Sequence, residues 1–142
     1  IYVDKDYRLI IFSPTITKEK DNIINAVKIA KEMDDIFSNF NNSSAIKIEY
    51  GISVHIGDLI IESKDNAIKF VSIGNTLAIA KRISESATSE VLLSEIVHAR
   101  TIGKVKAEKS GNASYWRLKR ISEREAYSDF VNRFVDRQRK AR

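Results

Sequence analysis

The stretch KIEYGISVHIGDLIIESKDNAIKFVSIGNTLAIAKR, residues 47–82, carries the clearest structural pattern in the chain. It predicts a strand over residues 48–56, a tight turn at 57–58 and a second strand over 59–61. A polar turn at 63–66 leads to a third strand over 68–73, and a turn at 74–76 opens a helix. We therefore expect a sheet in which a hairpin leads directly into a helix.

The first of these strands has two unlike faces. Large residues alternate along one face and small residues along the other, with Ile46, Ile48, Tyr50, Ile52, Val54 and Ile56 opposed to Gly51, Ser53 and His55. Because small side chains leave room above a strand, we expect another element to approach closely over Gly51 and Ser53. For His55, the ionisable residue on that face, we expect a hydrogen-bonded strand histidine rather than a catalyst.

Two further segments predict amphipathic helices. In residues 21–40 the apolar positions are spaced by three and four, which places Ile23, Val27, Ala30, Met33, Phe37 and Phe40 on one core-facing stripe. In residues 121–142, Ser122 and Glu125 form a capping box, and the apolar stripe consists of Ala126, Tyr127, Phe130, Val131, Phe134 and Val135. The second helix must pack on its own domain, on a second copy, or on a neighbouring domain of a longer chain.

Composition limits the possible functions. A chain of 142 residues with 43% hydrophobic and 30% charged residues predicts one globular domain with a substantial core. The absence of cysteine excludes a disulfide framework and a thiolate metal site, so we expect a cytoplasmic protein. No apolar run reaches about 18 residues, and no membrane span is expected.

The positive charge lies mainly at the end of the chain. The net charge is +5, and the last turns contain five cationic residues, Arg133, Arg137, Arg139, Lys140 and Arg142. Aromatic residues are not interleaved with basic residues on a predicted strand, and no nucleic-acid-binding motif is present. We therefore expect no nucleic-acid partner.

Two parts of the central stretch resemble the second half of a class III nucleotidyl cyclase domain, the family of adenylyl and guanylyl cyclases. Residues 50–61 are similar to the family's Gly-Ile-His-Thr-Gly-Glu hairpin, and residues 70–83 to Ile-Gly-Asp/Asn-Thr-Val-Asn followed by Ala-Ala-Arg-Leu. The similarity extends more weakly to residues 21–40, an amphipathic helix in the family, and to residues 90–95, a strand-to-helix junction there.

The resemblance implies an α+β fold. The expected form is a ferredoxin-like palm of two or three layers, with a mixed or antiparallel central sheet and two principal helices on one face. Residues 1–120 would form the cyclase-like domain without the family's first strand, and residues 121–142 a separate basic helix. A homodimer, or pairing with a second cyclase-like domain, is also implied, because the family assembles each active site between two protomers.

Few of the family's substrate-binding residues are matched. Arg82 occupies the position of the arginine that stabilises charge on the phosphate, and Asn75 lies in the substrate-binding turn. Ala78 stands where the family has the asparagine that orients the ribose, and Val71 where it has the residue that reads the base. Neither of these two side chains can form the required hydrogen bond.

The possible metal ligand is Asp6, at the position of the family's second metal-binding aspartate. It would bind Mg²⁺ or Mn²⁺ through its carboxylate, whereas the first aspartate would belong to the missing strand. A solvated turn residue is the alternative for Asp6, and Asp4 is the alternative ligand. For Arg82, a surface ion pair with Glu85 or Asp35 is an equally open role.

These matches favour a degenerate cyclase-homology domain that acts as a regulatory or dimerisation module in signalling. One alternative is an active cyclase that forms a cyclic nucleotide from ATP or GTP with a partner chain and Mg²⁺ or Mn²⁺. Another is a domain that binds a nucleoside triphosphate without converting it.

Overall fold

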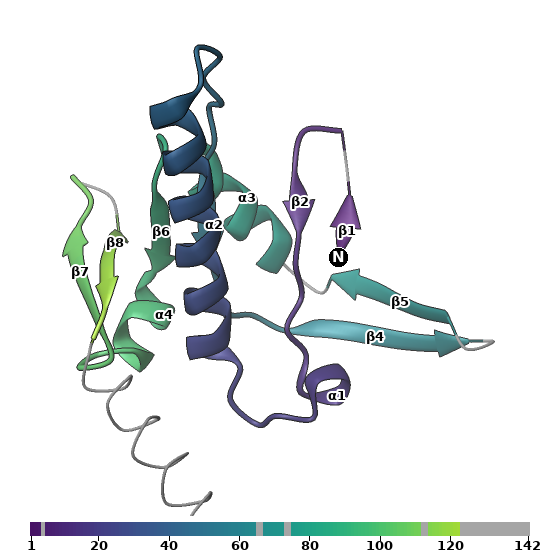
Figure 1. Cartoon of the computed structure of the whole chain (residues 1–142). Coiled ribbons are helices and arrows are strands. Elements are labelled where there is room, and N and C mark those ends of the chain that lie inside the picture. Colours follow the sequence, from purple (N-terminus) through teal and green to yellow (C-terminus); the bar gives the residue numbers. More distant parts are fainter. Residues whose placement is uncertain (4, 65–66, 73–74, 112–113, 123–142) are drawn as a thin grey trace, which may run out of the picture.

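The computed structural model describes residues 1–3, 5–64, 67–72, 75–111 and 114–122. Figure 1 shows the arrangement of its elements, which are β1 (Tyr2–Val3), β2 (Arg8–Leu9), α1 (Pro14–Thr17), α2 (Ile23–Ser43), β3 (Ile52–Val54), β4 (Leu59–Lys64), β5 (Ala67–Ser72), α3 (Thr76–Glu85), β6 (Val91–Ser94), α4 (Glu95–Arg100), β7 (Val105–Lys109) and β8 (Tyr115–Ile121). The expected C-terminal helix lies, from residue 123 onward, outside the described residues. Among the described helices, none has the length and apolar character needed to cross a bilayer.

The described strands form one mixed sheet and two short antiparallel pairs. The mixed sheet has the order β3-β6-β8-β7, in which β3 runs parallel to β6 and the other neighbours are antiparallel. Strand β1 pairs with β2, and β4 pairs with β5 over six residue pairs. The predicted α+β class is therefore confirmed, and the central sheet is mixed.

One face of the sheet is covered by α2, which is in front of the sheet in Figure 1. The buried cluster on this face contains residues of α2, β3, β6, α4 and β8, namely Val27, Ala30, Val54, Val91, Leu93, Val97 and Leu118. Burying such side chains contributes about 1.5–3 kcal/mol each, so this cluster is the main source of stability in the described part of the fold.

The opposite face is covered by α3. Ser53 donates its hydroxyl hydrogen bond to the main-chain oxygen of Ala80 at 2.8 Å, whereas its neighbour Val54 belongs to the cluster beneath α2. Successive strand residues point to opposite faces. The expectation that two principal helices share one face was therefore wrong, because α2 and α3 cover different faces.

The small residues of the central strand explain how closely α3 approaches. A Cβ atom built on Gly51 would lie 2.1 Å from the main-chain oxygen of Ser84 and 2.9 Å from that of Ala87, at the C-terminal end of α3. The prediction of a close neighbour over Gly51 and Ser53 is confirmed. It follows that the glycine fixes the distance between α3 and the sheet.

Helix α2 begins two residues after the predicted start and continues beyond the predicted end. The carboxylate of Asp21 accepts a hydrogen bond at 3.0 Å from the main-chain N–H of Ile23 and so satisfies one of the donors in the first turn. Val27 and Ala30 are buried as predicted, but Phe40 is 43% exposed. The expectation that Phe40 belongs to the core was wrong, because the helix extends past the edge of the core.

Candidate functional site

Three of the residues expected to bind substrate lie along one side of α3. Asn75 precedes the helix, and Ala78 and Arg82 follow at spacings of three and four, so the three residues form a single stripe. All three are exposed. Asn75 is the N-cap residue, but its side chain forms no capping hydrogen bond. The stripe is therefore accessible from solvent along the described length of the helix.

The start of α3 is held against the segment that connects β3 to β4. The hydroxyl of Thr76 donates a hydrogen bond to the main-chain oxygen of Asp58 at 3.1 Å. A Cβ atom on Gly57 would lie 2.4 Å from the Thr76 hydroxyl oxygen, so glycine is required at this contact. The expectation of a tight turn at Gly57 and Asp58 was wrong, because residues 55–58 form no turn and β3 and β4 belong to different sheets. The segment instead fixes where the exposed stripe begins.

The expected surface partners of Arg82 are paired with other cations. Glu85 lies 3.9 Å from Lys81, and the carboxylate of Asp35 lies 2.6 Å from the Lys31 ammonium group. Across the described ranges no ion pair includes Arg82. The ion-pair role proposed for Arg82 is therefore not observed, and the residue is exposed.

The remaining residues expected to take part in catalysis lie on other elements. Val71 is on β5, where its backbone is opposite Ile60, and its side chain is outside the described set, as is Asp4. Asp6 is exposed in the bend between β1 and β2. Its neighbour Tyr7 contacts α3, because the Lys81 ammonium group lies 4.9 Å from the centre of the Tyr7 ring.

The residues around Asp6 do not fit a multidentate metal site. Within the described part of the chain, no group of three or more His, Asp or Glu side chains is placed to bind one ion. A single exposed carboxylate is a weak ligand set for Mg²⁺ or Mn²⁺, which need several oxygen ligands. No catalytic step can therefore be derived through a metal held by these residues.

His55 follows the last residue of β3 and is half-buried. Burial lowers the pKa of its imidazole below the usual value of 6.5, because the charged form is less well solvated there. Its Nδ1 atom is buried without a hydrogen-bond partner. The structure therefore differs from the expected hydrogen-bonded strand histidine, at least at this nitrogen.

A polar cluster that the sequence did not reveal connects α2 with the segment before β3. The Tyr50 hydroxyl donates a hydrogen bond to the Asp34 carboxylate at 2.8 Å, and Lys31 lies 2.9 Å from the same carboxylate group. The Tyr50 ring also packs against Phe37, with the ring centres 4.9 Å apart. Burial, with the hydrogen bond to Asp34, raises the pKa of Tyr50 to about 12.

The substitution Tyr50→Phe is expected to change the alkaline pH dependence of stability. The phenol has an ordinary pKa of 10.0 and a folded-state pKa of about 12, so the folded state binds this proton more tightly. The resulting stabilisation is complete below pH 10 and is lost as the pH rises towards 12. Between pH 10 and 12, urea unfolding should show that the free energy of unfolding falls more steeply with pH for the wild type than for Tyr50→Phe. Equal dependence on pH in the two proteins would contradict the prediction.

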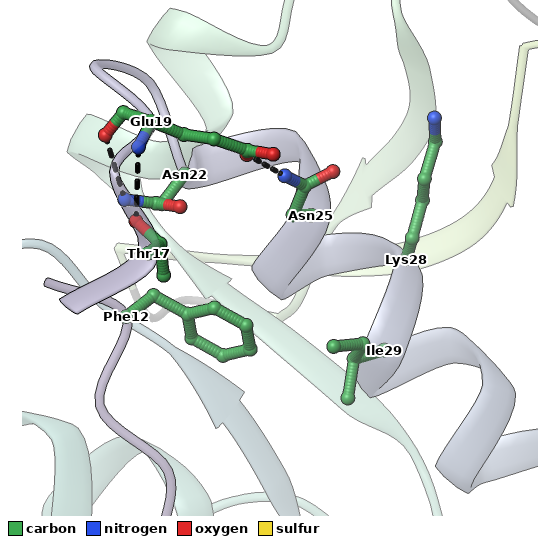
Figure 2. A pocket seen from close by; sticks show the side chains of 7 residues that line it. All are labelled: Phe12, Thr17, Glu19, Asn22, Asn25, Lys28 and Ile29. Carbon is green, nitrogen blue, oxygen red and sulfur yellow. Dashed lines mark hydrogen bonds between the residues drawn. The ribbon is translucent and has the colours of Figure 1, made fainter. Parts of the chain in front are cut away.

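A shallow hollow lies at the N-terminal end of α2 (Figure 2). It encloses about 370 Å³, and its lining includes Phe12, Glu19, Asn25 and Ile29. The Asn25 amide donates a hydrogen bond to the Glu19 carboxylate at 2.5 Å across its rim. None of the residues predicted from the sequence to bind substrate or metal lines this hollow.

One buried acceptor adjoins the hollow without being reachable from it. Asn22 is 8% exposed, and its amide nitrogen donates a hydrogen bond to the Glu19 main-chain oxygen at 3.3 Å. Its Oδ1 atom is fully buried and has no hydrogen-bond partner. A ligand in the hollow could not contact Oδ1 without local rearrangement.

Comparisons with known proteins leave the chain without an assigned family. No family model matches it, and neither a curated protein nor a solved structure matches it. Any proposal of function therefore rests on the residues and their geometry.

Proposed function

We propose that the chain is a degenerate cyclase-homology domain that pairs with a second such domain and acts as a regulatory or dimerisation module in signalling. The order of the elements supports this proposal. Strands β3, β4 and β5, helix α3, strand β6 and helix α4 follow one another in the order that the resemblance to class III cyclases implies. The hairpin implied for residues 50–61 is not formed, because β4 pairs with β5 and β3 pairs with β6. The parallel pairing of β3 with β6 joins the two ends of this series in one sheet.

The position of the first two strands supports a palm-like sheet that is open on one side. Strand β3 is at the end of the mixed sheet and pairs there with β6. Figure 1 shows β1 and β2 on the side of α2 opposite β7 and β8, which is the side of β3. Among the described strands β3 therefore has a neighbour on one side only, so a further strand could add to the sheet there.

The observation that carries the pairing role is the projection of β4 and β5. Figure 1 shows this hairpin extending away from α2 and from the four-stranded sheet. An isolated two-stranded hairpin is at best marginally stable in water, so a partner that covers it would add substantial stability. Ile60, near the base of the hairpin, is 43% exposed and offers an apolar contact.

The exposed stripe of α3 supports the loss of nucleotide chemistry. Its central residue is Ala78, whose methyl group can neither donate nor accept a hydrogen bond. Arg82 remains one turn further along and could bind an anion, but a single arginine does not orient a ribose. The proposed role is therefore one of association rather than catalysis.

The exposure of Arg82 favours one alternative, in which a partner chain supplies the missing groups. The pair would then convert ATP or GTP to a cyclic monophosphate and pyrophosphate, with Mg²⁺ or Mn²⁺ bound mainly by the partner's carboxylates. If the wild type formed more cyclic nucleotide than Arg82→Ala in the presence of Mn²⁺, this alternative would replace the proposal. Thermal stabilisation by a nucleotide without turnover would instead indicate a binding domain.

The pairing role predicts that Ile60→Glu weakens self-association. A carboxylate placed at the apolar contact loses its hydration in the interface, so the dissociation constant should rise by at least about tenfold. Light scattering should give twice the chain mass of 16.1 kDa for the wild type and a lower mass for the variant at the same concentration.

The matched control is Ile102→Glu, because Ile102 is 70% exposed and lies outside the hairpin, after α4. This variant should associate as the wild type does. A monomeric wild type, or equal effects of both substitutions, would overturn the proposal that the hairpin is the pairing surface.

A further inference from the structure

The connection from α4 to β7 lies at one end of the mixed sheet, beside the end of β8 (Figure 1). The Lys104 N–H donates a hydrogen bond to the Thr101 main-chain oxygen at 2.9 Å and so closes a four-residue turn. Thr101 is 1% exposed, and its hydroxyl donates a hydrogen bond to the Val97 oxygen at 2.8 Å. Gly103 has a φ angle of +81°, which suits the third position of such a turn. Residues 101–104, which we call the α4–β7 turn, are therefore fixed to the core at their base.

The second residue of the α4–β7 turn is apolar and exposed. Ile102 directly follows the buried Thr101, yet 70% of its surface is accessible to solvent. Among the described residues, apart from the two chain neighbours, none comes within 4 Å of a Cβ atom built on Gly103. Because the turn is already ordered, burying Ile102 in an external apolar phase would cost little conformational entropy.

Four exposed cationic side chains lie next to this turn in sequence or in register, namely Arg100, Lys104, Lys106 and Arg120. Arg100 ends α4, and Lys106 on β7 is directly opposite Arg120 on β8. Like charges opposite each other on neighbouring strands destabilise a sheet. Lys104 and Lys106 point to the same side, because side chains alternate along a strand. Positive charge is therefore concentrated beside Ile102.

Carboxylates of the protein do not neutralise these cations. Over the ranges that the structure describes, none of the four has an ion pair or a side-chain hydrogen bond. The carboxylates on the same elements have other partners, since Glu108 of β7 lies 3.0 Å from Lys119 and Glu95 of α4 accepts a hydrogen bond from Trp116 at 2.7 Å. An external anion would relieve the repulsion between the two opposed cations.

We propose that the α4–β7 turn binds an anionic lipid surface. Cations beside an apolar side chain fit this partner, since Ile102 would enter the boundary between headgroups and acyl chains while the cations contact lipid phosphates. A dissolved polyanion would neutralise the cations but would leave Ile102 in water. The contact requires no membrane-spanning helix, and it is independent of the pairing proposed for β4 and β5.

The proposed contact predicts how the effect of a charge varies along β7. Lys104 belongs to the turn, and Lys109, five residues later, lies about 16 Å further along the strand. This distance exceeds the electrostatic screening length of about 8 Å at physiological ionic strength. Lys104→Glu and Lys109→Glu change the net charge equally, so they form a matched pair that differs in distance from the turn.

The test measures sedimentation of the full-length protein with vesicles of phosphatidylcholine that contain about one third phosphatidylserine, at physiological ionic strength. Lys104→Glu should lower the partition coefficient at least about tenfold, because charge reversal removes an attraction and adds a repulsion. Lys109→Glu should lower it by less than about twofold. Equal effects of the two substitutions, or a wild type that does not bind these vesicles, would overturn the proposal.

The apolar part of the contact is tested with the same vesicles. Ile102→Ala should lower the partition coefficient about fivefold, because fewer apolar atoms leave water. The matched control is Ile46→Ala, since Ile46 is 76% exposed and lies between α2 and β3, outside the turn. This control should bind within about twofold of the wild type. The same partition coefficient for Ile102→Ala and the control would count against insertion of the turn and overturn the proposal.

Two further probes separate a lipid surface from other partners. The wild type should bind vesicles of phosphatidylcholine alone at least about tenfold more weakly than the anionic vesicles, and equal binding to both would overturn the proposal. The second probe is a single-stranded oligonucleotide. If the protein bound the oligonucleotide but not the anionic vesicles, and Lys104→Glu abolished that binding, the partner would be a nucleic acid and the proposal would be wrong.

Discussion

Gly51→Ala is expected to lower the free energy of unfolding by about 3 kcal/mol, at the upper end of the range for overpacked sites. The added methyl carbon would lie 2.1 Å from the Ser84 main-chain oxygen and 2.9 Å from that of Ala87. A main-chain oxygen cannot move aside as a flexible side chain can. Relief of the clash requires α3 to move away from the sheet, and that movement would also strain the hydrogen bond from Ser53 to Ala80 at 2.8 Å.

The matched control is Gly111→Ala. No atom lies within 4 Å of the added Cβ, but the φ angle of Gly111 is +53°, so this substitution costs only the backbone preference of about 1 kcal/mol. Urea unfolding of the three proteins at one concentration measures both effects. If Gly51→Ala lowered the free energy of unfolding no more than Gly111→Ala does, the packing of α3 on the sheet would not require its close approach to Gly51.

Alternation along the central stretch predicted where α3 would pack, but not how long the strand would be. Strand β3 contains only residues 52–54 of the predicted 48–56. The preceding residues lie instead beside the end of α2, where the Asn41 side chain accepts a hydrogen bond from the Ile48 N–H at 2.7 Å and donates one to the Ile48 oxygen at 2.8 Å. A side chain thus satisfies backbone groups that alternation alone would assign to a neighbouring strand.

The hairpin was predicted more accurately because its pattern is local. Strands β4 and β5 begin and end within a few residues of the predicted 59–61 and 68–73, and their register follows from a short connection between two apolar runs. The helix predicted to open at residues 74–76 likewise begins there, at Thr76. Such positions depend only on residues close in sequence.

The sequence pattern did not predict contacts between residues that are distant in sequence. His98 had no expected role, yet its ring stacks on Trp116 with centres 3.6 Å apart, and the Trp116 indole N–H donates a hydrogen bond to Glu95 at 2.7 Å. The ion pairs that occupy Glu85 and Asp35 are local, each with a lysine four residues earlier, but they depend on competition between neighbouring cations. Periodicity predicts which side of an element is apolar, but it does not select among several nearby partners.

Leu93→Ala is expected to remove about 3 kcal/mol of stability, within the range of 2–5 kcal/mol measured for truncated core leucines. Leu93 is fully buried in β6, and its neighbours in register are Val54 on β3 and Trp116 on β8. Because strands flank it on both sides and α2 covers its face of the sheet, the surroundings cannot easily collapse into the space left by the missing atoms. The free-energy cost of the cavity should therefore add fully to the free energy lost because fewer apolar atoms are buried.

Trp116 is the only tryptophan in the chain and packs against the cluster that contains Leu93, so its fluorescence reports unfolding of this part of the protein. Ile102→Ala is the matched control, because a side chain that is 70% exposed should change stability by less than about 0.5 kcal/mol. All proteins must be compared at one concentration, since self-association would raise the apparent stability of each. If Leu93→Ala proved as stable as the control, β6 would not be the centre of the fold, and the sheet that positions the exposed stripe of α3 would have to be assigned differently.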